Sequence, residues 1–385
     1  MKVCQPIAAR TNVSNIRKIL IVTSSLSAGG VGRNFLNLAY EFSERKIAVH
    51  LFLVNWHGDK RTFELPDSVT VHTGRGRARY DLLALRRVIS GLMPDVIISG
   101  PARINLLTGA AHAVTVGKCS RVIMTYRSNR IEELRRATLS AKALEFIANP
   151  LYRRADAVVG VSKGVTNSVI KTARLDPDRC HTIYNPAWVE SRGVDAHEAT
   201  GLEVLDKKKN KVLIACGRLV EQKDYPTLLH AFAKVLKSED VDLVILGEGK
   251  LRSELIGFAA PLGISKRVHF VGYVQDPMRY MVKADVFVLT SKWEGFGNVI
   301  VEALGAGLSV VSTDAPSGPA EILDDGRYGK LVPVGDQDAI CAAIIHCLAS
   351  PQAKHVSLKR ARSFSSTQIA SEYLRVAEKI INADQ

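Results

Sequence analysis

Residues 285–314 read DVFVLTSKWEGFGNVIVEALGAGLSVVSTD, and the order of residue types in this stretch decides the fold. The apolar run at its start predicts a strand, and the KWEGFG loop after it contains two glycines, which tolerate positive φ. Residues 298–307 predict an apolar helix with Asn298 as its N-cap, and residues 308–314 predict a second strand. A strand, a helix and a strand in this order form a βαβ unit of a parallel sheet.

The same alternation continues on both sides of this unit. In the first half of the chain, strands are expected at 18–25, 48–54, 69–73, 95–100, 120–126 and 156–162. In the second half, they are expected at 211–219, 241–249, 267–274, 285–291 and 308–314. A polar stretch, 189–210, separates the two series. We therefore predict an α/β protein of two doubly wound domains, 1–188 and 189–364, followed by an amphipathic helix within 365–385.

The composition is typical of a globular enzyme. The chain has 385 residues, enough for two domains, with 46% hydrophobic and 23% charged residues. No apolar run is long enough to span a membrane, and the first one, 18–26, is too short for a signal peptide, so we expect a cytoplasmic protein. The six cysteines are scattered without zinc spacing, which predicts free thiols rather than disulfides.

The positive charge is concentrated in one half. Residues 1–190 contain 28 Lys and Arg against 14 Asp and Glu, which accounts for the whole net charge of +14. Local clusters occur at 75–80, 86–87, 135–136 and 153–154. A one-sided basic surface attracts nucleic acid or an anionic membrane, although it can also serve only for solubility.

Two glutamates, Glu294 and Glu302, stand in the opening stretch among apolar and small residues. A buried carboxylate needs a partner, which can be a ligand. Glu294 follows the carboxyl end of a strand, and Glu302 lies about one turn into the next helix, so both face one pocket. Carboxylates bind vicinal hydroxyls well, and a nucleotide sugar offers two such sets. The alternative is a helix-start glutamate plus a glutamate paired to an arginine.

Two further stretches predict anion binding at the same cleft. In CGRLVEQKDYP, Arg218 ends a strand and Lys223 follows five residues later, so two cations could neutralise a diphosphate. In SSLSAGGVGRN, glycines at 29, 30 and 32 join the first strand to the first helix, whose start favours phosphate, although a tight turn would also explain them.

With these motifs in their order, the chain resembles retaining family 4 glycosyltransferases of the GT-B fold, in which two Rossmann-like domains face a cleft. The resemblance rests on EGFGNVIVE (294–302), GRLVEQK (217–223), LGEG (246–249), FVGYV (270–274) and GGVGR (29–33). It implies a basic N-terminal domain that binds the acceptor, a C-terminal domain that binds the donor, and a final helix that packs back toward the first domain.

The resemblance also implies roles for single residues. Glu302 would hold the ribose, and Glu294, with the loop that follows it, would hold the donor hexose. Arg218 and Lys223 would hold the diphosphate, and Glu294, Arg218 and Lys223 are the candidate catalytic residues. The remaining candidate donor-binding residues are Gly29, Gly30, Gly272, Gly295, Phe296, Gly297 and Asn298. Family members need no metal, so neither a metal nor another cofactor is expected.

The sequence departs from the family at one position. Many members carry a histidine where this chain has RVIMTYRSN (121–129), so Tyr126, Arg127 and Asn129 are candidate contacts to donor or acceptor, and no catalytic histidine is assigned. A lone Asp-x-Asp, Asp240 and Asp242, lies at the wrong end of its sheet for a site and is interpreted as a solvated turn.

We therefore expect a glycosyltransferase that moves a hexose or N-acetylhexosamine from a nucleotide diphosphate sugar to a glycan or polyprenyl-diphosphate-linked acceptor in bacterial surface-polysaccharide assembly. The Ser-Gly-Pro loop at 317–319 resembles members that use UDP-linked N-acetylhexosamines. The basic domain would rest on the inner face of the cell membrane. The alternatives are a nucleotide-sugar epimerase or another GT-B enzyme, and a nucleic-acid-binding protein, for which motifs and aromatic residues are lacking.

Overall fold

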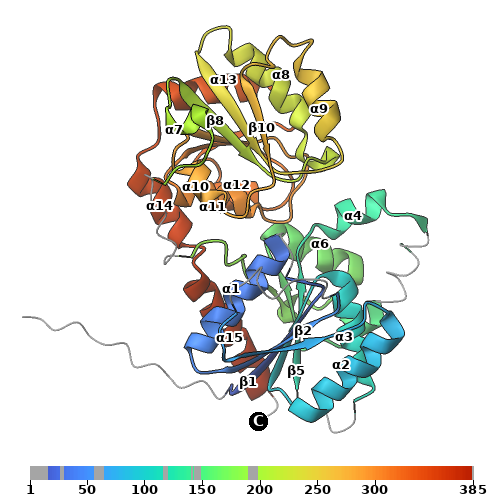
Figure 1. Cartoon of the computed structure of the whole chain (residues 1–385). Coiled ribbons are helices and arrows are strands. Elements are labelled where there is room, and N and C mark those ends of the chain that lie inside the picture. The colour runs from blue at the N-terminus through green and yellow to red at the C-terminus, as the bar shows by residue number, and fades with distance from the viewer. Residues whose placement is uncertain are drawn as a thin grey trace, which may run out of the picture.

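A computed structural model describes residues 16–26, 30–55, 65–115, 120–139, 142, 149–189 and 198–383. Its two lobes are stacked one above the other in Figure 1, each built around a parallel sheet with helices on both faces. The two sheets take their strands from the first and second halves of the chain, respectively. This confirms the predicted pair of doubly wound, Rossmann-like α/β domains.

The N-terminal sheet has seven strands in the order β3-β2-β1-β4-β5-β6-β7. The strands are β1 (Lys18–Thr23), β2 (Ala48–Leu53), β3 (Val69–Thr73), β4 (Val96–Ser99), β5 (Arg121–Tyr126), β6 (Ala157–Gly160) and β7 (Cys180–Thr182). The helices are α1 (Gly30–Glu44), α2 (Ala78–Leu92), α3 (Ala102–Ala113), α4 (Arg130–Arg136), α6 (Lys163–Ala173) and the 3₁₀ turn η2 (Pro177–Arg179).

The C-terminal sheet has six strands in the order β10-β9-β8-β11-β12-β13. The strands are β8 (Lys211–Cys216), β9 (Val241–Leu246), β10 (Val268–Gly272), β11 (Val286–Leu289), β12 (Ser309–Thr313) and β13 (Lys330–Val332). The helices and 3₁₀ turn are α7 (Glu203–Asp206), η3 (Glu221–Lys223), α8 (Tyr225–Val235), α9 (Arg252–Ala259), α10 (Met278–Met281), α11 (Asn298–Gly305), α12 (Pro319–Leu323), α13 (Gln337–Ala349), α14 (Lys354–Arg362) and α15 (Ser366–Asn382).

In both sheets the order reverses beside the first strand. The strand that starts each sheet, β1 or β8, pairs with its successor on one side and with β4 or β11 on the other. Ligands of doubly wound proteins bind at this reversal, beyond the carboxyl ends of the strands. The inner strands are buried on both faces, which explains why they read as continuous apolar runs rather than as alternating ones, whereas the edge strands β3, β7, β10 and β13 are partly exposed.

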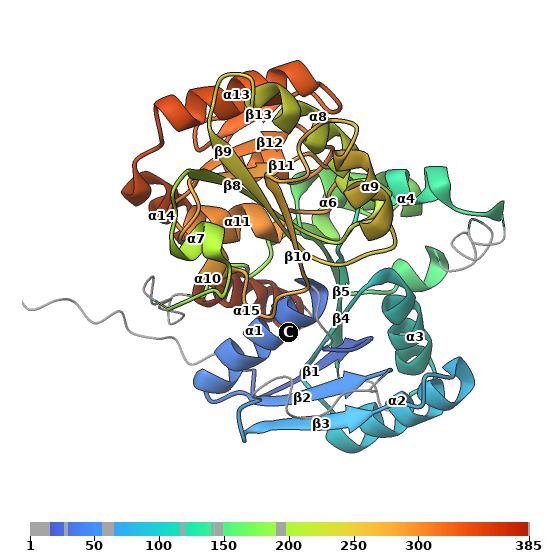
Figure 2. The same cartoon turned by 45° about the horizontal axis from the view of Figure 1, so that its top comes forward.

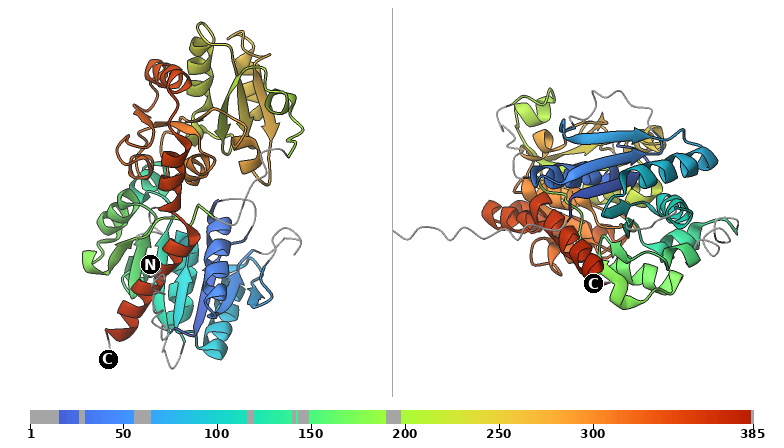
Figure 3. Two further views of the ribbon diagram at one scale, coloured as in Figure 1. Left: turned by 90° about the vertical axis from the view of Figure 1, so that its left-hand side faces the viewer. Right: turned by 90° about the horizontal axis from the view of Figure 1, so that it is seen from below.

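The junction between the lobes is made by two crossing segments. Trp188 forms a bridge with Ser365, so the chain leaving the first lobe runs beside the chain returning to it. Helix α15 then packs on α1 and β5, as the left view of Figure 3 shows. Three aromatic rings, those of Tyr184, Phe296 and Phe364, pack together at this junction with centroids about 5.5 Å apart. The domain limits given above remain a prediction.

Several details differ from the sequence-based expectations. Gly297, with φ of 106°, is the N-cap of α11, and Asn298 is the first helical residue. Asp242 is not in a solvated turn: it is buried in β9, where it accepts a hydrogen bond from Asn210 and contacts His269. Of the cysteines in the described ranges, 180, 216, 341 and 347 are free thiols, whereas Cys4 and Cys119 lie outside those ranges. No helix in the described ranges is long and apolar enough to cross a membrane.

Candidate active site

A cleft of about 760 Å³ lies between the two lobes, lined by both. Its N-terminal wall follows β1, β4 and β5, and its C-terminal wall follows β8, β9, β10 and β11. Both walls therefore lie at the carboxyl ends of parallel strands, and they include the point of reversal in each sheet. Helix α1 of the lower lobe and helix α11 of the upper lobe in Figure 2 contact each other at this junction through Asn34 and Asn298.

Glu294 lies in the loop after β11 and is 8% exposed. Its Oε1 accepts hydrogen bonds from the Lys223 ammonium at 2.6 Å and from the Ser291 hydroxyl at 2.7 Å. In the described part of the chain Oε2 forms no such bond. The charge-assisted bond from Lys223 satisfies Oε1 of this buried carboxylate, and Oε2 is left to accept from a ligand in the cleft.

The start of α11 supplies three backbone donors beside Glu294. Phe296, Gly297 and Asn298 line the cleft, and their amides donate to no acceptor within the described residues. The first turn of a helix leaves such amides unsatisfied and carries partial positive charge, which favours hydroxyl oxygens and anions. The positive φ of Gly297 lets the loop turn sharply into the helix.

Glu302 lies one turn further along α11, and its side chain is 12% exposed. Its Oε1 is 3.2 Å from Nη1 of Arg33, which comes from α1 on the opposite wall. Arg33 also donates to the Gln275 carbonyl at 3.0 Å. The predicted partner of this carboxylate was the ligand, with an arginine as the alternative. The structure places an arginine there and leaves the cleft open beside it.

The predicted phosphate-binding residues lie on the same cleft. Arg218 follows β8, is exposed, and forms no ion pair with the described residues. Lys223 is the last residue of η3, and its ammonium lines the cleft while it forms the ion pair with Glu294. Gly30 is the first residue of α1, and a Cβ built there would lie 3.1 Å from the side-chain Nδ2 of Asn298. The starts of α1 and α11 therefore approach each other closely. Gly29 lies outside the described residues.

A chain of side-chain amides crosses the cleft floor. Asn298 donates to Asn34 at 2.9 Å, Asn185 donates to Asn298 at 2.8 Å, and Arg127 donates to Asn185 at 2.7 Å. The Arg127 guanidinium also lies over the Phe35 ring, 4.3 Å from its centroid. Burial lowers the pKa of Arg127. Its Nε and Nη2 donate to no acceptor among the described residues.

The other candidates from residues 121–129 are placed differently. Tyr126 is wrong as a cleft residue: it is 2% exposed and packs edge-on against Tyr152 in the core. Asn129 caps α4 and donates to the Ser317 hydroxyl of the other lobe at 2.8 Å, so it joins the walls without lining the cleft. Gly272 ends β10 just before the cleft residues Tyr273 and Val274, and its carbonyl accepts from Gly247.

Cys216, at the end of β8, also lines the cleft. Burial, and secondarily the charge of Glu302, raises the pKa of its thiol to about 12. In the described ranges no group of three or more His, Cys, Asp or Glu is placed to hold a metal ion. The expectation of a metal-independent site stays a prediction.

Several cleft residues were not predicted. Arg33 was quoted only as part of GGVGR, and nothing in the sequence shows that it meets a residue 269 positions away. Asn34 and Asn185 could not be found for the same reason. Glu133 and Trp293 line the cleft from α4 and from the loop beside Glu294. Trp293 belongs to the KWEGFG loop, so its place beside Glu294 could have been predicted. Helix α4 contains no motif, so nothing in the sequence pointed to Glu133.

Two family models cover most of the chain. Residues 28–189 match the one described as Glycosyltransferase Family 4, and residues 202–364 match Glycosyl transferases group 1. The two matches correspond to the two lobes and together include both walls of the cleft. The chain belongs to glycosyltransferase family 4.

The full-length comparisons agree with this membership. The chain is 28% identical over 381 residues to the Campylobacter jejuni N-acetylgalactosamine-N,N'-diacetylbacillosaminyl-diphospho-undecaprenol 4-alpha-N-acetylgalactosaminyltransferase, covering 94% of this glycosyltransferase and 99% of that protein. Among solved structures, the lipopolysaccharide outer core galactosyltransferase WaaB matches with a TM-score of 0.70 at 18% identity, over 96% of this chain and 100% of that one.

A third relative was solved with ligands. Anabaena HepE, in complex with UDP and glucose, matches with a TM-score of 0.73 at 20% identity, over 93% of this chain and 98% of that one. Likeness at this identity shows the fold, and it confirms the GT-B arrangement expected for this family.

Proposed function

We propose that this glycosyltransferase moves a hexose or N-acetylhexosamine from a nucleotide diphosphate sugar, UDP-linked by preference, to a lipid-linked or other glycan acceptor in bacterial surface-polysaccharide assembly, with retention of anomeric configuration. The relative from Campylobacter jejuni is named for transferring N-acetylgalactosamine to a diphospho-undecaprenol-linked sugar, and HepE was solved with UDP. Both names favour this donor and acceptor class.

The observation that carries the proposal is the pair of carboxylates on one wall of an interdomain cleft. Glu294 and Glu302 are held nearly buried, each beside one cation, at the start of α11. One carboxylate in the loop and one on the helix can each accept hydrogen bonds from a set of hydroxyls, here those of the hexose and those of the ribose. The amides of Phe296, Gly297 and Asn298 would add donors to the hexose.

The leaving group would lie between the cations. Arg218 and Lys223 line the cleft after β8, and the start of α1 faces them from the other lobe. Positive groups placed where the diphosphate develops charge lower the barrier to its departure. In this proposal the bond from the sugar C1 to the phosphate oxygen breaks. The acceptor oxygen bonds to C1 on the same face, and its proton passes to the departing phosphate.

Arg127 would contribute from the N-terminal wall. Its Nη1 donates to Asn185, which fixes the guanidinium, and its Nε and Nη2 are buried without an acceptor among the described residues. We propose that its positive charge stabilises the transferred sugar or its phosphate, at the position where many relatives have a histidine. Because cations supply the charge at the leaving group, we expect activity to survive removal of divalent metals by EDTA.

The direct test is nucleotide release with product analysis. The chain is incubated with UDP-N-acetylgalactosamine, UDP-N-acetylglucosamine, UDP-galactose and UDP-glucose, together with aryl α-glycosides as acceptors. We expect UDP release that depends on the acceptor, and an α-linked product by NMR. Formation of an isomeric nucleotide sugar without UDP release would indicate the epimerase alternative. A β-linked product would contradict retention.

We further propose that the basic N-terminal domain rests on the anionic inner face of the cell membrane. Arg75, Arg77 and Arg79 precede or begin α2, and Arg86 and Arg87 continue along it; all five are exposed, beside the exposed apolar side chains of Tyr80 and Leu83. A basic surface with a few apolar side chains attracts anionic lipid, and salt screens the attraction.

This placement is tested by liposome sedimentation. Binding to phosphatidylglycerol vesicles should be strong at low salt, weak at high salt, and reduced in Arg86→Gln/Arg87→Gln. The control is Lys250→Gln/Lys266→Gln, which removes two exposed charges from the C-terminal domain. Equal loss in both variants, or no binding by the wild-type protein, would contradict the proposal.

A further inference from the structure

We propose that the N-terminal wall of the cleft holds a binding subsite for the hydroxyl groups of the acceptor sugar, with the carboxylate of Glu133 on α4 as its main acceptor of hydrogen bonds. This inference rests on the proposed function, since it presumes a sugar acceptor. The N-terminal domain as a whole is expected to bind the acceptor, and the inference assigns this task to Glu133, a residue that belongs to none of the sequence motifs and to none of the donor-binding residues.

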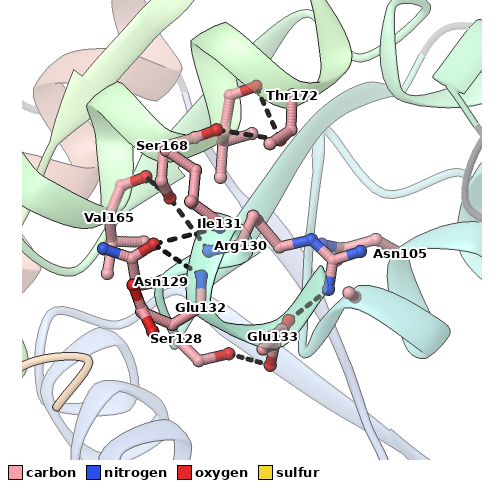
Figure 4. A network of polar contacts seen from close by, with 12 residues as sticks. Asn105, Ser128, Asn129, Arg130, Ile131, Glu132, Glu133, Val165, Ser168 and Thr172 are labelled. Atoms are coloured by element: carbon pink, nitrogen blue, oxygen red, sulfur yellow. Dashed lines mark hydrogen bonds and ion pairs between the residues drawn. The ribbon is translucent and has the colours of Figure 1, made fainter. Parts of the chain in front are cut away.

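The position of α4 is fixed from both lobes. Asn129 caps the helix by accepting from the amides of Ile131 and Glu132, and the same side chain donates to Ser317 of the C-terminal domain. The amide of Arg130 donates to the Ser168 hydroxyl on α6 at 3.0 Å. Figure 4 shows the Asn129 cap and the bond to Ser168 converging on the first turn of α4. The helix is therefore held rigidly beside the cleft rather than as a loose arm.

Glu133 is oriented by two neighbours. One carboxylate oxygen accepts from the Ser128 hydroxyl and the other from Nη1 of Arg130, as Figure 4 shows. The Arg130 side chain is only 9% exposed, whereas that of Glu133 is 41% exposed and lines the cleft. The arginine balances the charge of the carboxylate, and each oxygen retains a lone pair for another donor.

The subsite faces the loop that would hold the donor sugar. The Arg136 guanidinium, at the end of α4, lies over the Trp293 ring, 3.2 Å from its centroid. One residue after Glu294, Gly295 packs against the backbone of Arg127 and Ser128. Glu133 therefore lies in the segment 127–136, which contacts the Glu294 loop from the opposite wall of the cleft. An acceptor bound there would present its hydroxyl across the cleft to the donor sugar.

The charge of Glu133 selects the part of the acceptor that binds. A carboxylate attracts hydroxyl donors and repels phosphate. The diphosphate of a lipid-linked acceptor would therefore lie elsewhere, and the terminal sugar would lie against Glu133. The donor diphosphate is kept apart for the same reason, because its cations Arg218 and Lys223 lie on the other wall.

The test separates acceptor binding from donor chemistry. In Glu133→Gln, we expect KM for the best aryl α-glycoside acceptor to rise roughly tenfold or more, because a charge-assisted hydrogen bond is lost. KM for the UDP-sugar and its slow hydrolysis without acceptor should be unchanged. Glu132→Gln is the matched control, since it lies one residue earlier, pairs with Arg135 and does not line the cleft.

A binding measurement supports the kinetics. With UDP present, saturation-transfer NMR signals of the glycoside should persist in Glu132→Gln and disappear in Glu133→Gln, while thermal melting shows both variants folded. An unchanged acceptor KM in Glu133→Gln, or a loss of donor hydrolysis equal to the loss of transfer, would overturn the subsite. Failure of the wild-type protein to hydrolyse or transfer any of the UDP-sugars would instead overturn the proposed function, and the subsite with it.

Discussion

Lys223 and Glu294 form a nearly buried ion pair at the cleft, with side chains 13% and 10% exposed. Such a pair adds little net stability, but removing one partner leaves an uncompensated charge. Lys223 therefore balances the nearly buried charge of Glu294, and it also lines the cleft. The arrangement of Arg33 and Glu302 on opposite walls follows the same logic.

Lys223→Met should destabilise the protein by about 3 kcal/mol, because the Glu294 charge is left with only the Ser291 hydroxyl. Lys223→Met/Glu294→Gln should recover a large part of this loss, since no charge is then stranded. Urea unfolding measures both. The control is Lys207→Met, whose exposed pair with Glu203 should contribute less than about 1 kcal/mol. A double variant as unstable as Lys223→Met would contradict this account.

At this scale the sequence located both carboxylates and both cations that line the cleft, because glycines mark the loops that follow their strands. It could not supply their protein partners: Lys223 is 71 residues from Glu294, and Arg33 lies on the other domain. Tyr126 was misplaced for a different reason. Strand β5 is buried on both faces, so alternation does not reveal which residue points to the cleft.

Among the elements, the β2–β3 edge of the N-terminal sheet carries a pair of histidines. Nδ1 of His50 and Nε2 of His72 are 3.2 Å apart, with the rings stacked. Burial lowers the pKa of both, and for His50 the charges of His72 and Lys18 lower it further. The folded state therefore binds fewer protons than the unfolded chain, in which histidine titrates near 6.5.

Stability should therefore be lost on the acid side of neutrality. The free energy of unfolding should be at its full value above about pH 7 and should fall as the pH drops through the unfolded pKa near 6.5. In His72→Gln the fall between pH 7 and pH 5 should be smaller but not absent, because burial also lowers the pKa of His181. Urea unfolding at several pH values measures this. An equal fall in both proteins would contradict it.

The elements themselves were largely predictable. Every strand expected before residue 314 is present, because apolar runs bounded by glycine, proline and polar residues are strong signals. The cap of α11 was not predicted correctly. Asn298 looks like an N-cap by residue type, but Gly297 can adopt the positive φ that the loop needs, and the side-chain amide of Asn298 is bonded to Asn34 and Asn185 instead.

In the whole molecule, the two domains touch through polar contacts that surround the cleft. Ser162 donates to the Gly295 carbonyl at 2.8 Å, and the Glu321 carboxylate accepts from the amides of Lys163 and Gly164 at the start of α6. These contacts fix the position of the Glu294 loop against the N-terminal wall of the cleft. None of them was predictable from the sequence, because each joins residues more than 130 positions apart.

Gly295→Ala tests this arrangement. An added Cβ would overlap the Arg127 carbonyl, so the walls must separate. We expect kcat for transfer to fall by about 100-fold, since a displacement near 1 Å is enough for such a loss. UDP affinity should change little, because Glu302, Arg218 and Lys223 belong to one lobe. The control is Gly257→Ala on α9, where an added Cβ meets nothing within 4 Å. Wild-type turnover in Gly295→Ala would contradict the expectation.

The central claim is that the two acidic side chains on α11 and its preceding loop hold different hydroxyl groups of one donor. Calorimetric titration of UDP and of the preferred UDP-sugar into the wild-type protein, Glu302→Gln and Glu294→Gln tests it most directly. Glu302→Gln should weaken both ligands by roughly tenfold, through the ribose, whereas Glu294→Gln should leave UDP unchanged and weaken only the UDP-sugar. Wild-type affinities for both ligands in both variants would contradict the claim.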